Sequence, residues 1–448
     1  MQEAPKSLII TSMSDKPQVC IVGGGMITQV QILPCLYQLQ RAGIVGEVSV
    51  CALNSAPLKA LAQDQTLKKA FHGHSFTAYP PMDTPEGRNF PDLFKEVIAK
   101  MPKGSIVVVA VPDQLHFPVI QTALESSQHI CCVKPLVLKY SQAMEIEKIA
   151  YEKGLVVGVE YHKRLDDRAL IARRLYKEGR FGQFRIGHAE MNEPYYYRHS
   201  NFQNWCTVEN SDMFTYVGCH YVDQVHFITG LLPKAVSVYG IKDTYPNGKT
   251  GYLWTDARVI WENDGCLHVT NIMGYPDEGP GGNFQGLRMY CAGADKSGML
   301  VHNDQYRGVE HCYIEKGGAA GDTYYAQPSP DYFKYVDLGG PGLTPVGYGY
   351  RSIEYIVKNI CKAIDLAPAN GRGTPADRRG LILDEKQALL QRRKLIKQFD
   401  ADGIMATPAN SSYNELVIEA GRLSILNGGK EVEITYGEKA GVDFRDRM

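Results

Sequence analysis

The chain has 448 residues, of which 44% are hydrophobic and 22% charged, and its formal net charge is −1. This length predicts two domains, while the near-zero charge without long basic runs argues against nucleic acid or an anionic membrane as a partner. Eleven cysteines without a CxxC pair are typical of buried thiols in a reducing compartment, so we expect a cytoplasmic protein.

Up to residue 160, short apolar runs alternate with helical patterns. This alternation predicts a parallel sheet with helices on both faces, and therefore an α/β, Rossmann-type doubly wound domain over residues 1–160. The apolar runs are strand-length and too short to span a bilayer. The predicted strands are 19–22, 48–53, 106–111, 129–133 and 155–159.

A glycine-rich turn follows the first predicted strand. The sequence Gly-Gly-Gly-Met-Ile-Thr begins at Gly23 and leads into a helical pattern, which is the strand–turn–helix context of a dinucleotide site. Gly23 would allow the tight turn, and Gly25 would let the backbone approach the pyrophosphate. Met26 and Ile27 begin the helix and are expected to lie beside the cofactor.

The end of the second predicted strand bears on the choice of coenzyme. Ala52 occupies the position where a carboxylate would bind the adenosine ribose, and no arginine nearby is a clear partner for a 2′-phosphate. Asn54 can hydrogen-bond the ribose. We therefore expect NAD as the cofactor, with NADP left open.

The segment 105–136 places chemistry at the carboxyl ends of two further strands. Its first strand ends at Val111, a predicted cofactor contact, and His116 follows in the connecting loop. The second strand runs into Lys134, which precedes a proline and so favours extended geometry at the strand end. Because the carboxyl ends of parallel strands face the ligand crevice, Lys134 is placed to do chemistry.

After residue 180 the pattern changes to closely spaced strands, which predicts an α+β domain with a mostly antiparallel open sheet over residues 161–448. An exposed sheet face in this domain favours a homo-oligomer, either a dimer or a tetramer. We also expect a Gly/Tyr-rich insertion at about 303–350 and a C-terminal hairpin at about 415–436, around an Asn-Gly-Gly turn. The predicted strands are 184–191, 235–239, 257–261, 267–272 and 287–292, and the predicted helices are 213–229, 351–367 and 383–399.

Taken together, these motifs resemble the Gfo/Idh/MocA family of sugar and cyclitol oxidoreductases, over nearly the whole chain. The family's Glu-Lys-Pro motif is present as Val133-Lys134-Pro135, and its Asp-x-Gly-x-His motif is present from Tyr216 to His220. The resemblance implies a nucleotide-binding domain followed by a substrate domain. It also implies that Lys134 and His220 are catalytic and that His116 lies near the nicotinamide. Val133 and Tyr216 replace the family's two carboxylates.

The helical pattern around His220 adds a spacing argument. Asp212, Tyr216 and His220 are four residues apart and share one helix face, so Asp212 can partly replace the missing carboxylate. A histidine near neutral pKa suits removal of a hydroxyl proton, and a lysine suits stabilisation of the alkoxide. Asp223 and His226 also share this helix, but without a further ligand-spaced cluster we expect no metal.

Candidate substrate contacts lie before this helix. Sugar binding commonly uses aromatic faces and polar side chains, and residues 192–210 are rich in both. Lys163 follows the last strand of the first domain and should lie at the crevice edge. With Asp212 and His220, the predicted substrate residues are Lys163, Tyr195, Tyr197, Asn201 and Trp205.

The leading hypothesis is an NAD(P)-dependent dehydrogenase acting on a secondary hydroxyl of a sugar, glycoside or cyclitol, such as C3 of a pyranoside. An alternative is a glycosidase or glycoside lyase that acts through transient oxidation, with Tyr216 as the base at C2. A third hypothesis is a non-catalytic NAD(P)- and sugar-sensing regulator. The retention of both Lys134 and His220 argues against it.

Overall fold

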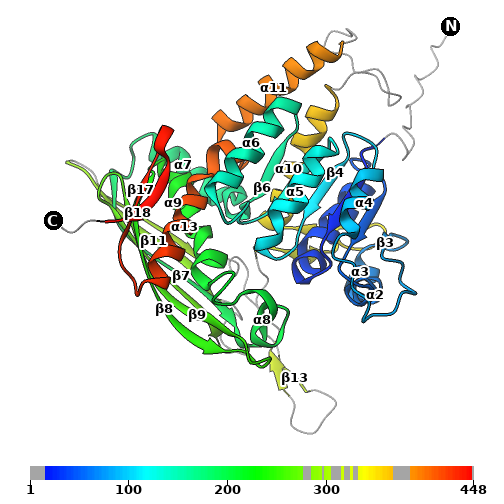
Figure 1. Cartoon of the computed structure of the whole chain (residues 1–448), viewed down its shortest axis with the longest axis horizontal. Coiled ribbons are helices and arrows are strands. Elements are labelled where there is room, and N and C mark those ends of the chain that lie inside the picture. Colours follow the sequence, from blue (N-terminus) through cyan, green and yellow to red (C-terminus); the bar gives the residue numbers. More distant parts are fainter. Residues whose placement is uncertain are drawn as a thin grey trace.

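In the computed structural model, the described residues are 16–275, 284–294, 297–303, 314–316, 323–325, 331–366 and 384–445. They form two large sheets with helices between and around them (Figure 1). This arrangement confirms the predicted fold class, a Rossmann-type parallel sheet followed by a mostly antiparallel open sheet. None of the helices in these ranges is long and apolar enough to cross a bilayer.

The first sheet has six parallel strands in the order β3-β2-β1-β4-β5-β6. Its central strands are buried along their whole length, as expected when helices cover both faces. The strand order reverses between β1 and β4, and ligands of such sheets bind at this switch point. The strands are β1 (Val19–Val22), β2 (Val48–Cys51), β3 (Thr77–Tyr79), β4 (Ile106–Val109), β5 (His129–Val133) and β6 (Val157–Glu160).

Most helices of this sheet come from the N-terminal part of the chain, but two return from far along the sequence. Helix α10 (Tyr348–Ile364) buries Ile353, Ile356 and Ile360 in the same core as β1. The proposed division at residue 160 therefore separates the two sheets but not all of the helices. The others are η2 (Thr28–Ile32), α1 (Leu33–Arg41), α2 (Ser55–Gln63), α3 (Gln65–Ala70), α4 (Leu93–Lys100), η3 (Asp113–Leu115), α5 (His116–Glu125), α6 (Tyr140–Lys153) and α11 (Glu385–Asp402).

The second sheet has eight strands in the order β12-β11-β7-β10-β9-β8-β17-β18, and only β7 and β10 pair in parallel. Its inner face packs against helices, whereas its outer face exposes Ile186, Tyr239 and Met299. The strands are β7 (Gln183–Pro194), β8 (Pro233–Thr244), β9 (Thr250–Trp261), β10 (Cys266–Tyr275), β11 (Phe284–Ala292), β12 (Ser297–Asn303), β17 (Val432–Thr435) and β18 (Gly441–Phe444).

The helices on the inner face lie between the two sheets (Figure 1). Helix α13 contacts both β8 of the second sheet and α6 of the first. This layer therefore brings residues from the second half of the chain to the carboxyl ends of the first sheet. Its helices are η4 (His162–Leu165), α7 (Asp167–Lys177), η5 (Tyr195–His199), α8 (Phe202–Trp205), η6 (Phe214–Gly218), α9 (Cys219–Thr229), α12 (Pro408–Ser411) and α13 (Tyr413–Leu426).

The C-terminal hairpin expected at 415–436 was wrong in its position. Residues Tyr413–Leu426 form helix α13, and the hairpin is β17–β18, joined through η7 (Gly437–Lys439). Leu416, Val417 and Ala420 recur at helical spacing and pack into the core of the second sheet. The Asn-Gly-Gly sequence directly follows the end of this helix and does not turn a hairpin. Gly428 and Gly429 both have the positive φ that is common after a helix end.

Within the predicted insertion at 303–350, residues 304–313, 317–322 and 326–330 lie outside the described residues, which include β13 (Ile314–Lys316), β14 (Thr323–Tyr325) and the segment 331–347. That segment carries a small sheet of β15 (Lys334–Val336) and β16 (Thr344–Val346) and lies against the first domain. Arg41 donates hydrogen bonds to the carbonyls of Pro341 (2.9 Å) and Leu343 (2.7 Å). The amide of Leu343 donates to the carbonyl of Ala70 at 3.0 Å.

Candidate active site

The glycine turn after β1 has the backbone that a dinucleotide site requires. Gly23 has φ of 118°, and a Cβ at this position would lie 2.0 Å from the carbonyl oxygen of Ala110 at the end of β4. Gly25, by contrast, has no atom within 4 Å of its would-be Cβ, which leaves space for a ligand over the start of η2. Met26 is exposed beside it and Ile27 is partly buried. The residues present fit a bound pyrophosphate.

This difference between the two glycines gives a first prediction. Gly23→Ala should weaken NADH binding at least about tenfold, because the turn must move away from β4 to admit the methyl group. Gly25→Ala should fold with a melting temperature near that of the wild type, since the protein itself leaves room there, while the methyl group still intrudes on the ligand. Fluorescence titration with NADH measures both variants, and wild-type affinity in Gly23→Ala would contradict the packing argument.

At the end of β2, the predicted ribose contact already has partners. The side-chain oxygen of Asn54 accepts a hydrogen bond from the amide of Ala56 at 3.2 Å and so caps α2. Its side-chain nitrogen donates to the side-chain oxygen of Asn89 at 2.9 Å. The two asparagines form a polar, uncharged end to the strand, and Ala52 is buried beside it.

His116 holds the loop of the candidate lysine. Its ring is fully buried at the start of α5, with Nδ1 2.8 Å from the carbonyl oxygen of Pro135 and Nε2 2.9 Å from that of Val111. Both ring nitrogens therefore face backbone oxygens. His116 was expected near the nicotinamide, and the structure shows its ring joining the ends of β4 and β5. The carbonyl of Val111, another predicted cofactor contact, is occupied by the same interaction.

Lys134 reaches from the first domain to the second. It follows β5 directly, and only 8% of it is exposed. Its ammonium group donates a hydrogen bond to the backbone carbonyl of Tyr216 and lies 3.8 Å from the centroid of the Tyr216 ring. The segment from Tyr216 to His220 was predicted as the partner motif of Lys134, and the fold brings the two together.

His220 lies at the start of α9 in a buried, positively charged setting. Its Nδ1 has no hydrogen-bond partner among the described residues. Burial lowers the pKa of His220 well below its usual value, and the positive charges of Lys134 and Lys163 and the His162 ring lower it further. The imidazole is therefore unprotonated at neutral pH and able to accept a proton.

His162 is a residue of this site that the sequence reasoning missed. Its ring centroid lies 4.6 Å from that of His220, and its Nδ1 is 3.1 Å from a carboxylate oxygen of Glu160 at the end of β6. Glu160 in turn accepts hydrogen bonds from Gln31 at 2.8 Å and from Ser352. The position of residues 161–164 directly after a strand could have identified His162, but from that position only Lys163 was predicted to contact the substrate.

Glu193 is a second missed residue. It ends β7 one position before a proline, and only 4% of it is exposed. Burial raises the pKa of Glu193 to about 7, although the charges of Lys134 and Lys163 act in the opposite direction. The stretch around Glu193 attracted attention for its tyrosines, so the carboxylate was passed over. Lys134, His220, Lys163 and Glu193 thus form a buried cluster of titratable groups.

The comparisons with known proteins agree with this geometry. Residues 18–161 match the Gfo/Idh/MocA family, described as an oxidoreductase family with an NAD-binding Rossmann fold. These residues, about a third of the chain, are thus similar to that family. The glycine turn, the strand order and the strand carrying Lys134 all lie within the matched residues.

Curated relatives match this chain over parts of their length. A scyllo-inositol 2-dehydrogenase (NADP(+)) from Bacillus subtilis is 26% identical over 34% of this chain and 42% of its own. A 2,7-anhydro-N-acetylneuraminate hydratase from Escherichia coli is 27% identical over 30% of this chain and 36% of its own. The chain thus spans less than half the length of the curated relatives it matches.

Solved structures match over almost the whole chain and show its fold. GenD2 from gentamicin A biosynthesis, in complex with NAD, has a TM-score of 0.61 at 15% identity, covering 97% of this chain and 100% of that one. An inositol dehydrogenase homolog from Azotobacter vinelandii, complexed with NADH and myo-inositol, has a TM-score of 0.59 at 16% identity, covering 93% and 97%. The second, open sheet of this chain therefore also follows the architecture of these solved structures.

One departure from the Gfo/Idh/MocA pattern is Tyr216 at the position of the motif aspartate. Its ring packs edge-on against Phe202 and Trp205, at centroid distances of 4.9 and 5.3 Å. Burial, followed by the negative charge of Glu193, raises the pKa of Tyr216 well above its usual value. The phenol is thus held in its protonated form, which argues against the predicted role of a base.

Asp212 does not take the place of the missing aspartate. One carboxylate oxygen accepts a hydrogen bond from the amide of Thr215 at 2.8 Å, and the other pairs with Arg422 of α13 at 2.8 Å. Asp212 thus caps the first turn of the helix and ties it to α13. The shared helix face was predicted, but this partner from a distant helix directs the carboxylate elsewhere.

The predicted substrate residues separate into two groups. Lys163 is fully buried near His220, and its ammonium group donates to the side-chain oxygen of Gln285 at 2.7 Å. The predicted aromatic residues mostly pack against one another. Tyr197 stacks on Phe202 with ring centroids 5.1 Å apart, and Trp205 packs against the same Phe202 ring. Tyr195 is exposed, and the side-chain oxygen of Asn201 accepts a hydrogen bond from Asn204.

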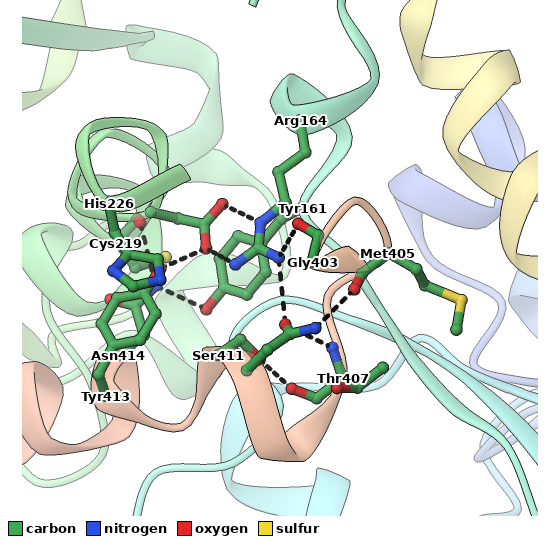
Figure 2. Close-up of polar contacts among 12 residues, drawn as sticks. Tyr161, Arg164, Cys219, His226, Gly403, Met405, Thr407, Ser411, Tyr413 and Asn414 are labelled. Atoms are coloured by element: carbon green, nitrogen blue, oxygen red, sulfur yellow. Dashed lines mark hydrogen bonds and ion pairs between the residues drawn. The ribbon is translucent and has the colours of Figure 1, made fainter. Parts of the chain in front are cut away.

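Asp223, considered for a metal, forms a buried ion pair with Arg164, which Figure 2 shows together with Tyr413 and His226. Arg164 binds both of its carboxylate oxygens, at 2.8 and 2.6 Å, and the hydroxyl of Tyr413 donates to one of them at 2.7 Å. His226 points its Nδ1 at the carbonyl of Leu231, 2.8 Å away, and stacks on Tyr413. In the described ranges, no three His, Cys, Asp or Glu residues are grouped to hold a metal ion.

Proposed function

We propose that this chain is an NAD(P)-dependent dehydrogenase that transfers hydride between the nicotinamide and a secondary hydroxyl of a sugar, glycoside or cyclitol. The single observation that carries this proposal is the hydrogen bond from Lys134 to the backbone of Tyr216, four residues before His220. Lys134 and His220 are both buried, and Lys134 follows the carboxyl end of β5, the edge at which such sheets bind their ligands.

The chemistry follows from the two side chains. Oxidation of a secondary alcohol needs a base for the hydroxyl proton, and the unprotonated His220 can accept it. The ammonium group of Lys134 can stabilise the negative charge that develops on the substrate oxygen. Bound nicotinamide supplies the hydride acceptor. The buried setting excludes water, which strengthens these charge interactions.

NAD is the proposed coenzyme. Asn54 and Asn89 form a neutral polar pair at the end of β2, where binding of a 2′-phosphate would call for an arginine. This pair suits the uncharged ribose hydroxyls of NAD. Parallel assays with NAD⁺ and NADP⁺ test the choice, with the lower KM expected for NAD⁺.

The function is tested by incubating the full chain with NAD⁺ or NADP⁺ and a panel of cyclitols, free sugars and glycosides. At least one alcohol should give reduced nicotinamide, seen by its absorbance, and mass spectrometry should show a product two hydrogens lighter. A panel that yields no reduced coenzyme while NADH still binds would reject the dehydrogenase and favour the sensor hypothesis.

A glycosidase or lyase that acts through transient oxidation is the second candidate, because the site holds Glu193 besides His220. This activity predicts release of nitrophenol from an aryl glycoside without net formation of NADH. Recovery of an oxidised glycoside with its aglycone intact would instead support the simple dehydrogenase.

A further inference from the structure

His162 contacts the candidate base directly, yet the proposed hydride transfer gives it no role. The centroid of its ring lies 4.6 Å from that of His220, with 47° between the two ring planes. Tyr161, the preceding residue, meets His220 edge-on, with centroids 6.4 Å apart and 90° between the planes. Two consecutive residues after β6 therefore pack against the imidazole of His220.

His220 lacks the kind of partner that usually orients a histidine base. A hydrogen bond from one ring nitrogen to a carboxylate or a backbone carbonyl commonly fixes the tautomer and the orientation of such a ring. The Nδ1 of His220 has no such partner in the part of the chain that the structure describes. Tyr216 stands at the motif position of the aspartate, and Asp212 pairs with Arg422 instead. The rings packed against His220 are therefore what can hold its orientation.

The carboxylate of Glu160 fixes the ring of His162. Nδ1 of His162 lies 3.1 Å from Oε2 of Glu160, and both residues are buried. The other carboxylate oxygen accepts hydrogen bonds from Gln31 at 2.8 Å and from Ser352. Ser352 belongs to α10, and Gln31 belongs to η2, the helix that follows the glycine turn. Both oxygens of Glu160 are thus engaged, and its partners come from three different elements.

Two tyrosines complete the surroundings of His162. Tyr348, the first residue of α10, lies 5.6 Å from its ring, with 26° between the planes. Tyr332 lies 4.9 Å away, and its hydroxyl donates a hydrogen bond to the side-chain oxygen of Gln31. A side chain confined by packing and hydrogen bonds in this way keeps the residue that it contacts in one orientation. The surroundings of His162 therefore suit it to hold His220.

We propose that His162 is the positioning residue for His220. Glu160 fixes the ring of His162, and that ring holds the imidazole of His220 in the orientation that takes the substrate proton. This role rests on the proposed function, in which His220 is the base. It gives the site a carboxylate–histidine–histidine series where the family motif has an aspartate. Because Gln31 belongs to the helix after the glycine turn, the same series joins the candidate base to the coenzyme-binding helix.

His162→Phe tests this role, because it keeps an aromatic ring and removes the hydrogen bond to Glu160. With an alcohol that the wild type oxidises, kcat should fall by about 10- to 100-fold, the scale that follows a small misplacement of a reacting group. KM for the alcohol and the Kd for NADH should change little. The His162 ring, with Lys134 and Lys163, lowers the pKa of His220, so its loss should move the acid limb of the rate profile to higher pH.

A second variant shows whether Glu160 and His162 act in series. Glu160→Gln keeps the length of the side chain and an oxygen for Gln31 and Ser352, but presents an amide to His162. It should also lower kcat with little change in KM. The combination with His162→Phe should lower kcat no further than His162→Phe alone, because the series is already broken. Independent, multiplying losses in the double variant would overturn the proposal.

His226→Phe is the matched control. His226 is a partly buried histidine on the same helix as His220, with its Nδ1 2.8 Å from a backbone carbonyl and its ring 4.0 Å from that of Tyr413. It should keep the wild-type kcat, and NADH fluorescence and thermal unfolding should show that every variant is folded. A wild-type kcat and an unmoved acid limb in His162→Phe would reject the role of His162 alone. Failure of the wild type to oxidise any alcohol would instead reject the dehydrogenase, and this role with it.

Discussion

Lys134→Met should lower kcat/KM for oxidation of an accepted alcohol by roughly 10²- to 10⁴-fold. Methionine keeps much of the length of the side chain but removes the ammonium group that stabilises charge on the substrate oxygen, and losses of this size follow removal of such groups. The same group supports His220 and Glu193, so its loss should also change the pH profile of the rate. Initial rates across a range of pH values measure both effects.

Lys139→Met is the matched control for this variant. Lys139 ends the same loop but is exposed at the start of α6, so its removal should leave the rate unchanged. Lys134→Met also removes the hydrogen bond from the ammonium group to the backbone carbonyl of Tyr216, which keeps the weaker thiol donor of Cys219 at 3.6 Å, and this loss costs about 1–3 kcal/mol of stability. NADH binding and thermal unfolding distinguish this effect from a catalytic one. A near-wild-type rate in Lys134→Met would exclude Lys134 from the chemistry.

The features predictable from the sequence were those set by local chemistry. The glycine turn after β1 was one, because the strand end, the glycines and the helix start adjoin in sequence, although the atom that leaves no room for a Cβ at Gly23 belongs to Ala110 at the end of the distant β4. The parallel sheet was another, since its strands appear as short apolar runs separated by helical patterns. The nearness of Lys134 to the helix of His220 came from a family resemblance, which carries long-range information that periodicity lacks.

The features that escaped prediction depend on contacts between distant parts of the chain. Glu160 is important because Gln31 and Ser352, from opposite ends of the chain, both hydrogen-bond it and so hold His162. Asp212 was predicted to share a helix face with Tyr216 and His220, but it lies before the helix, and its partner Arg422 lies on a helix that had been predicted as a strand. A single sequence without structure does not show such pairings.

The C-terminal part of the chain shows that an Asn-Gly-Gly sequence is compatible with two different local structures. Asn427-Gly428-Gly429 suits a hairpin turn, yet glycine with positive φ equally suits the residues after a helix. The residues before the Asn-Gly-Gly sequence determine which of the two structures forms. Leu416, Val417 and Ala420 pack on the second sheet as one helix face, and burial of this face outweighs the turn preference.

Asp223→Ala should destabilise the fold by about 3–5 kcal/mol, the cost of leaving one member of a buried ion pair without its partner. Arg164 and Asp223 are each 1% exposed, and the hydroxyl of Tyr413 also depends on the carboxylate (Figure 2). The three residues belong to η4, α9 and α13, so the pair joins the helices that carry the candidate site. Urea unfolding followed by circular dichroism measures the change.

A double variant separates the cost of an unpaired charge from the value of the pair itself. Arg164→Met combined with Asp223→Leu should lose far less stability than Asp223→Ala, because it removes both charges and fills the space with apolar atoms. Glu86→Ala breaks the more exposed pair with Lys59 and should cost no more than about 1 kcal/mol. If the double variant were as unstable as Asp223→Ala, the pair itself would stabilise the fold. A smaller loss of stability in the double variant would show that Asp223→Ala is destabilising chiefly because it leaves the buried charge of Arg164 unpaired.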